Sequence, residues 1–321
     1  MEIDQVEAFV AIVRGRGFTR AASALHLSQP AVSRRLDLLE RELGAPLFER
    51  IRTGVVLTEA GRAFLPHAEA LLASMRDGVE AVRALEGTDR GAITLALVGT
   101  LASTTLTGCL QAFRETYPHV QLRLRTALSH EVSALVRRGD ATLGLRYDTD
   151  PHPELVSKVI HDEPRVVVCS PRHRLAHSRQ VGPAMLAGEA WIGFPARPDG
   201  PEEPYGSSLR QCLTACGLGT AEIIAIDSLT AQKRMVEAGF GLGLLPESSV
   251  DEELRVGTLR QLKVPAMQVT LPVVLIHRRR AYLSGATRQL IEVLTARPMP
   301  TAPAGGSPRK RPGHRAPTLR S

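Results

Sequence analysis

The stretch from Ser28 to Gly44, SQPAVSRRLDLLERELG, constrains the fold of this chain more than any other feature. Ser28 can cap a helix, and Pro30 is tolerated in a first helical turn because the N–H it lacks would have no partner there. The apolar positions that follow have helical spacing and predict one buried stripe: Val32, Leu36, Leu39 and Leu43. At about 100° per residue, Arg34 falls opposite that stripe and faces outward.

Two shorter apolar segments precede this helix. The first, residues 6–13, has the spacing of an amphipathic helix, with Asp4 as its expected N-cap. The second, residues 21–25, is expected to be a short helix capped by Thr19, with small alanines that let another helix approach. A tight turn then leads to Ser28. Two short helices, a turn and a longer third helix predict a helix-turn-helix.

The N-terminal end of the third helix is where such a motif meets base edges in the major groove. Glutamine suits adenine there and arginine suits guanine. Residues 47–58, LFERIRTGVVLT, then read as a β-hairpin wing whose arginines can reach phosphates. The candidate DNA-binding residues are Gln29, Pro30, Ser33, Arg34, Arg35, Arg50 and Arg52. The alternative for Arg34 is an ordinary solvated arginine.

Residues 59 to about 86 contain no cluster of turn residues, and their apolar positions alternate in steps of three and four. These positions predict a coiled-coil-like seam: Phe64, Ala68, Leu71, Met75, Val79, Val82 and Leu85. About 28 residues give roughly 42 Å of helix, which needs a packing partner to be stable. Pro66 is expected in an early turn, where it can bend the helix.

From residue 91 onward, apolar strands alternate with amphipathic helices, which predicts α/β units around a parallel sheet. Ligands of open α/β sheets bind at the C-terminal ends of strands, next to helix N-termini. The candidate effector-binding residues at such ends are Gly99, Thr100, Ser103, Ser129, Arg146, Phe194, Pro195, Ser228 and Leu229. Hydroxyls, backbone N–H groups and Arg146 suit a small anion, most simply a carboxylate. Alternatively, Thr100 and Ser228 only cap helices, and Arg146 only pairs with Asp148.

Residues 6–61 resemble the N-terminal region of LysR-type transcriptional regulators throughout. The residues that carry the resemblance are Phe9, Phe18, Ala21-Ala22, Leu25, Ser28-Gln29-Pro30-Ala31-Val32-Ser33, Leu39-Glu40, Leu43-Gly44, Leu47-Phe48, Arg50 and Leu57-Thr58-Glu59-Ala60-Gly61. The order of strands and helices up to about Pro298 is also similar to that family.

The resemblance implies an α/β protein with an N-terminal winged helix-turn-helix, a long linker helix and a two-lobed effector domain shaped like a periplasmic binding protein. The implied divisions are 1–58 for DNA binding, 59–88 for the linker, and 91–298 for the effector domain. Lobe I then comprises 91–162 and 268–298, and lobe II comprises 163–267. Residues 299–321 form a basic tail that composition predicts to be disordered.

The resemblance also implies the partners. They are double-stranded promoter DNA, a small-molecule effector, a second copy paired through the linker helix, a homotetramer, and RNA polymerase. One position departs from the family: many members carry an acid in the strand where this chain has Thr142, and Asp140 lies two residues away. The charge balance beneath the cleft therefore differs from that of the family.

Several classes of function find little support in the sequence. The net charge is +7, but residues 297–321 carry six basic residues and no acid, so local placement and not bulk charge must account for DNA binding. The chain shows no apolar run long enough for a bilayer and no basic leader, which predicts a cytoplasmic protein with no membrane partner. No motif predicts catalysis, a metal or a cofactor.

Two rival functions remain. A solute-binding protein would explain residues 91–298 but leave the helix-turn-helix without a role. A thiol-redox-responsive regulator would use Cys212 and Cys216, which have helical i, i+4 spacing. A disulfide between them would need particular geometry.

Overall fold

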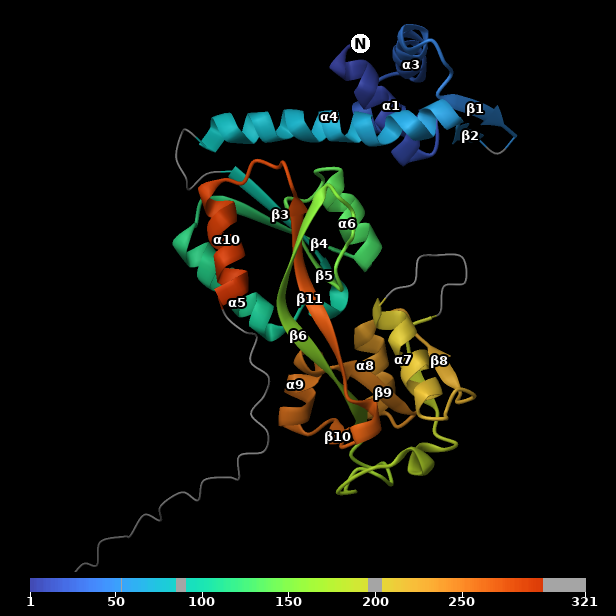
Figure 1. The fold of residues 1–321 in the computed structure, drawn as a ribbon, viewed down its shortest axis with the longest axis vertical. Helices are drawn as coiled ribbons and strands as arrows, with labels where there is room; N and C mark the ends of the chain where they lie inside the picture. Colours follow the sequence, from blue (N-terminus) through green and yellow to red (C-terminus); the bar gives the residue numbers. More distant parts are fainter. Residues whose placement is uncertain (53, 85–90, 196–203, 297–321) are drawn as a thin grey trace, which may run out of the picture.

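The computed structural model describes residues 1–52, 54–84, 91–195 and 204–296. The predicted disordered tail and the last residues of the predicted linker, 85–88, lie outside the described residues. The chain starts with three helices and a hairpin, joined to one long helix that crosses the end of a two-lobed domain (Figure 1). The elements of this first part are α1 (Ile3–Gly15), α2 (Phe18–Leu25), α3 (Gln29–Leu43), β1 (Phe48–Ile51), β2 (Gly54–Leu57) and α4 (Glu59–Arg83).

The predicted winged helix-turn-helix is confirmed. Ser28 caps α3, since its Oγ accepts a hydrogen bond from the backbone N–H of Ala31 at 3.4 Å. The predicted stripe is buried at its first three positions, whereas Leu43, in the last turn, is 40% exposed. The wing is an antiparallel pair in which Phe48 lies opposite Leu57.

Two predicted helix caps are wrong. Helix α1 starts two residues earlier than expected, with Glu2 as its N-cap, because the Glu2 N–H donates a hydrogen bond to Oε1 of Gln5. Helix α2 starts at Phe18 after Gly17, whose φ of 155° lets the chain turn directly into the helix, so Thr19 is already helical.

Helix α4 is continuous and is capped by Thr58, whose Oγ1 accepts from the Gly61 N–H at 2.9 Å. Pro66 lies inside it, in the third turn. The side of α4 that faces its own chain buries Ala68 and Leu72. Because Ala68 packs into the core of the DNA-binding module, the predicted seam is divided between contacts within the chain and a surface that is left exposed.

The effector domain is built on one sheet whose strands follow the order β4-β3-β5-β11-β6-β9-β7-β8, with β10 beside β6. Its strands are β3 (Gly91–Val98), β4 (Val120–Ala127), β5 (Leu143–Tyr147), β6 (Leu155–Cys169), β7 (Trp191–Gly193), β8 (Ile223–Ala225), β9 (Leu242–Pro246), β10 (Arg260–Leu262) and β11 (Val269–Arg278). Its helices are η2 (Gly99–Leu101), α5 (Thr104–Thr116), α6 (Ser129–Arg137), η3 (Pro183–Leu186), α7 (Pro204–Ala215), α8 (Leu229–Glu237), α9 (Glu247–Val256), η4 (Pro265–Met267) and α10 (Gly285–Ala296).

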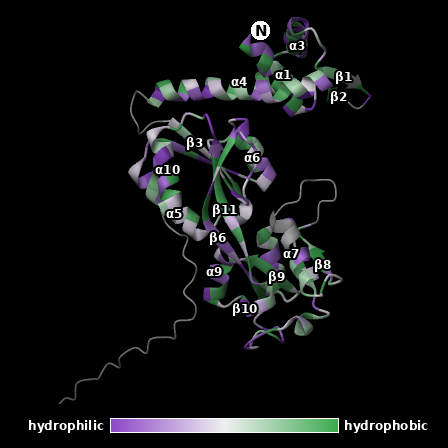
Figure 2. Ribbon diagram, viewed as in Figure 1, coloured by the Kyte–Doolittle hydropathy of each residue, from purple (hydrophilic) through white to green (hydrophobic). Residues whose placement is uncertain are grey.

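The predicted parallel sheet is confirmed only in part, because the sheet is mixed. Strand β3 pairs in parallel with β4 and β5, but β11 and β6 run antiparallel to their neighbours. They do so because both strands pass through both lobes, one leading into lobe II and the other returning from it. Hydrophobic residues concentrate in the central strands (Figure 2). None of the helices within the described residues is both long and apolar enough to cross a bilayer.

Candidate DNA interface and effector cleft

The start of α3 presents an accessible polar surface. Gln29, Pro30 and Arg34 are exposed and Ser33 is half-buried, while Val32 on the opposite side is fully buried. No hydrogen bond or ion pair ties the Arg34 guanidinium to any other described residue. Because α3 is held by its apolar side and its Ser28 cap, these side chains lie on the outer surface of the module.

Arg35 lies in a different environment from Arg34. Its guanidinium forms an ion pair with Asp4 of α1 at 3.2 Å, so it joins two helices of the module. On the wing, Arg52 is exposed. Arg50 lies in β1 opposite Val55, and its side chain is outside the described atoms.

The outward side of α4 carries an unusual set of exposed apolar residues. Leu71, Met75, Val79 and Val82 follow one another at helical spacing and are 37–65% exposed. By contrast, Phe64, in the earlier part of the predicted seam, packs against Phe9 in α1, and the centroids of the two rings are 5.3 Å apart. The exposed strip therefore begins at Leu71, beside Leu72, which still packs into the core of the DNA-binding module.

Three of the predicted effector residues in lobe I are hydroxyl side chains that are almost fully buried: Thr100, Ser103 and Ser129. Ser103 caps α5, since the Leu106 N–H lies 3.3 Å from its Oγ. Ser129 is the first residue of α6. The Thr100 hydroxyl donates to the phenolic oxygen of Tyr147 at 3.0 Å, and Gly99 beside it is exposed.

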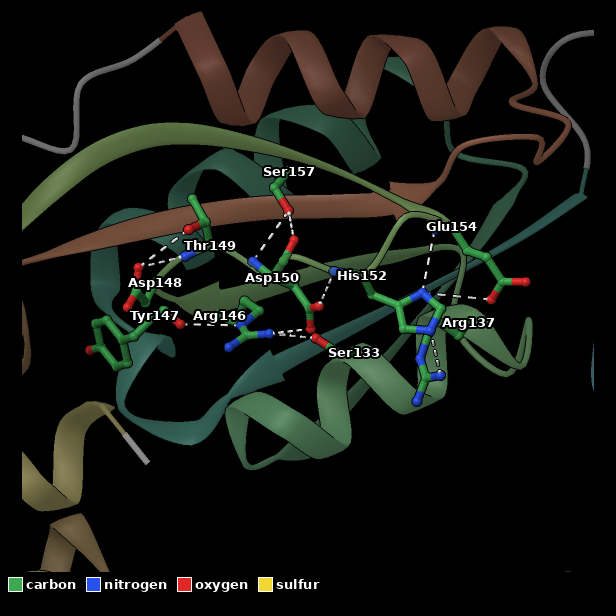
Figure 3. A network of polar contacts seen from close by, with 10 residues as sticks. All are labelled: Ser133, Arg137, Arg146, Tyr147, Asp148, Thr149, Asp150, His152, Glu154 and Ser157. Atoms are coloured by element: carbon green, nitrogen blue, oxygen red, sulfur yellow. Dashed lines mark hydrogen bonds and ion pairs between the residues drawn. The ribbon is translucent and has the colours of Figure 1, made fainter. Parts of the chain in front are cut away.

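Arg146 is buried, but its charge is already neutralised within lobe I (Figure 3). One terminal nitrogen of its guanidinium donates to Asp150 at 2.5 Å and to Ser133 of α6 at 2.7 Å. The predicted alternative partner, Asp148, instead accepts from the N–H of Thr149. The pKa of the Asp150 carboxyl lies below its usual range; burial opposes this shift, and hydrogen bonds from Ser133 and the His152 N–H, with the charge of Arg146, outweigh it.

The candidate residues of lobe II lie at the ends of two other elements. Phe194 follows β7 and packs against the hydrophobic core of lobe I, so it bridges the two lobes; Pro195 beside it is exposed. Ser228 caps α8, where its Oγ accepts from the Ala231 N–H at 3.4 Å, and Leu229 is half-buried. Helix α9 also contacts η2, so lobe II meets the segment that carries Gly99 and Thr100.

The cysteines give little support to redox sensing. All four are free thiols. Cys212 is buried, which raises its pKa, and burial raises the pKa of Cys169 to about 11. A raised pKa lowers the fraction of reactive thiolate. Among the described residues, no group of three or more histidine, cysteine or acidic side chains could hold a metal ion.

Sequence reasoning missed one group of charged residues. Asp140, in the turn between α6 and β5, lies 3.1 Å from Arg14 of α1 and 3.4 Å from Arg76 of α4. These residues are more than 60 positions apart in the chain. The only signal in the sequence was that Asp140 lies two residues before Thr142, the position at which many members of the family carry an acidic residue.

Comparison with known proteins identifies the class of this chain. Residues 3–62 match the family model for the bacterial regulatory helix-turn-helix protein of the lysR family, and residues 86–298 match the LysR substrate binding domain. The chain belongs to the LysR family of transcriptional regulators.

Curated relatives extend over most of the chain. It is 31% identical over 268 residues to the HTH-type transcriptional regulator CfxR of Cupriavidus necator, covering 82% of this chain and 81% of that protein. It is 29% identical to the RuBisCO operon transcriptional regulator of Allochromatium vinosum, covering 91% of this chain and 95% of that protein.

Two solved full-length structures share the fold. OxyR C199D from Pseudomonas aeruginosa has a TM-score of 0.68 at 22% identity and covers 92% of this chain and 94% of its own. CbnR complexed with its target DNA has a TM-score of 0.61 at 24% identity, and the match covers 92% of this chain and 99% of that chain. The fold of this chain, DNA-binding module included, is therefore that of full-length LysR-type regulators.

Proposed function

We propose that this chain regulates transcription by placing the N-terminal end of α3 in the major groove of promoter DNA. Gln29, Ser33 and Arg34 would meet base edges, and the wing arginines Arg50 and Arg52 would meet phosphates. The observation that carries this proposal is the pair of neighbouring arginines. Arg34 is exposed, whereas Arg35 is held by Asp4. Of the two arginines, this difference supports base contacts for Arg34 only, and a structural role within the module for Arg35.

The test is a binding selection from randomised DNA with the wild-type chain, Arg34→Ala and Arg35→Ala. We expect Arg34→Ala to cost about 1–3 kcal/mol of DNA-binding free energy and to relax the preference at one base pair per half-site. Arg35→Ala is the matched control, and it should weaken binding to all sequences alike. An unchanged consensus with unchanged discrimination for Arg34→Ala would mean that Arg34 reads no base.

The second part of the proposal concerns assembly. We propose that two copies pair through Leu71, Met75, Val79 and Val82 of α4. An apolar strip of this length at helical spacing is typical of a helix–helix interface. Two-fold pairing would present two α3 helices to half-sites about one helical turn, or a small multiple, apart.

The third part concerns the signal. We propose that a small anionic effector, most simply a carboxylate, binds between the lobes. The buried hydroxyls of Thr100, Ser103 and Ser129 and the N-terminal ends of α5, α6 and α8 support an anion, because helix N-termini favour negative charge. Since Asp150 neutralises Arg146, the helix ends supply more of the attraction than the sequence alone indicated.

A panel of small carboxylates, measured by thermal shift on the full chain, tests this part, because a bound ligand raises the apparent stability. Thr100→Val should remove the shift and the response of DNA binding to the ligand. DNA affinity without ligand should stay near wild type. Thr116→Val, an exposed position at the opposite end of α5, is the control. A ligand that still acts on Thr100→Val at unchanged concentration would contradict the cleft assignment.

A further inference from the structure

Three parts of the molecule meet at one group of charged side chains. This junction cluster comprises Arg14, Glu69, Arg76, Arg138 and Asp140. Arg14 belongs to the DNA-binding module, Glu69 and Arg76 to the linker helix α4, and the last two residues to the turn between α6 and β5 in lobe I.

Asp140 is the centre of the junction cluster. One carboxylate oxygen lies 3.1 Å from Arg14 and 3.4 Å from Arg76, and the other lies 3.4 Å from Arg138. Its side chain is only 14% exposed. Each of the three parts thus supplies a guanidinium to the same carboxylate, so the position of Asp140 fixes the three relative to one another.

The backbone of the same turn also fits closely against α4. Gly139 has a φ of +69°, and a Cβ at that position would lie 3.0 Å from the Cβ of Ala73. Arg76 donates a hydrogen bond to the carbonyl of Arg138. A second contact lies further along α4, where Arg278 at the end of β11 donates two hydrogen bonds to Asp77, at 2.7 and 2.9 Å. The turn is therefore seated in one orientation on the helix.

Helix α6 connects this contact to the proposed effector cleft. It starts at Ser129 and ends at Arg137, a length of roughly 13 Å, just before the turn that carries Asp140. In the middle of the helix, Ser133 is bonded to Arg146. A rigid displacement of α6 at its cleft end therefore moves Asp140 against α1 and α4.

The junction cluster contributes orientation more than stability. The pKa of Glu69 is raised, because burial outweighs the attraction of Arg138 and Arg14. Burial also lowers the pKa of Arg76. Charged groups held at such a cost define one arrangement of the parts that carry them while adding little to the free energy of folding.

We infer that Asp140 is a positioning residue that holds the DNA-reading module in a fixed orientation on lobe I, and that movement of α6 reaches the DNA through this contact. The inference rests on the proposed DNA-binding function. Beyond that function, it names the contact within one chain, between Asp140 and the arginines of α1 and α4, that determines which spacing of half-sites the protein prefers.

The test uses the full chain and two kinds of DNA: a single half-site, and duplexes with two half-sites at a series of spacings. For the wild type we expect a marked preference for one spacing. Asp140→Asn should reduce this preference by about tenfold, within the range of measured coupling energies, and leave single half-site affinity unchanged. Arg14→Gln should have the same effect, and the double variant should lose no more than either single variant.

Two further variants sharpen the test. Asp140→Glu keeps the carboxylate and should recover part of the spacing preference. Asp162→Asn, an exposed position on β6, is the matched control and should behave as wild type.

Unchanged spacing preference in both Asp140→Asn and Arg14→Gln would overturn the inference. Loss of single half-site affinity in Asp140→Asn would also overturn it, because the residue would then only support the fold. If the wild-type chain fails to bind a half-site, the proposed function falls, and the inference falls with it.

Discussion

The two halves of α4 use the same periodic apolar pattern for different purposes. In the first half, Phe64 and Ala68 complete the core of the DNA-binding module. In the second half, Leu71, Met75 and Val82 are exposed, although they continue the same three- and four-residue steps. The difference shows that a repeat defines which side of a helix is apolar but leaves open whether its own chain or another one covers that side.

The largest expected effect comes from placing a charge in the first half. Ala68 is 1% exposed, so Ala68→Glu would bury a carboxylate without a partner. We expect a loss of at least about 3 kcal/mol in the free energy of unfolding of the DNA-binding module, and loss of DNA binding. Ala70→Glu, two residues further on, is exposed and should be nearly neutral. Thermal unfolding followed by circular dichroism makes the comparison; equal effects would contradict the assigned burial.

Charges in the second half should separate subunits without unfolding them. Leu71→Glu with Val82→Glu places carboxylates in the proposed helix–helix interface, and we expect a folded monomer. Its affinity for a two-half-site DNA should fall by about 100-fold or more, because the second module no longer binds intramolecularly. Sedimentation at micromolar concentration measures the assembly, again with Ala70→Glu as the control. A sedimentation coefficient equal to that of wild type would rule out this interface.

The smallest effect is expected at Glu69, where the two halves meet. Its pKa is raised by burial, so the folded state disfavours the ionised carboxylate and loses stability as the pH rises above the ordinary glutamate value. Glu69→Gln removes this loss. We expect the variant to be more stable than wild type at pH 7, by less than about 1 kcal/mol, with a smaller difference at pH 5. Denaturant unfolding at the two pH values checks this, and a variant less stable than wild type at pH 7 would refute it.

The sequence predicted those parts of the fold that depend on neighbours in the chain. The Ser28 cap, the buried stripe of α3 and the hairpin wing all rest on contacts within a few residues. The predicted N-caps of α1 and α2 were wrong, because the start of each helix depends on a side-chain contact or a backbone conformation that a motif does not show. Asp4 forms an ion pair with Arg35, and Gly17 adopts a backbone conformation that lets α2 start at Phe18.

The candidate sites divide in the same way. The exposure of Arg34 follows from helical geometry alone. The neutralisation of Arg146 by Asp150 depends on the loop after β5, and the sequence indicated Asp148 instead. The junction cluster was not predictable, because Arg14 and Asp140 are 126 residues apart and come together only when α4 lies across lobe I (Figure 1).

The paired strands β6 and β11 have a mechanical consequence. They run side by side from Leu155 opposite Arg278 to Arg165 opposite Val269, through both lobes, with one shift of register between Val273 and Val274. A continuous ladder resists stretching and sliding, because either would break backbone hydrogen bonds. It yields more easily to torsion about its long axis, since strands are already twisted and a bulge increases the twist locally. The relative motion open to the lobes is therefore a rotation, which would turn lobe I beneath α4 instead of pulling it away.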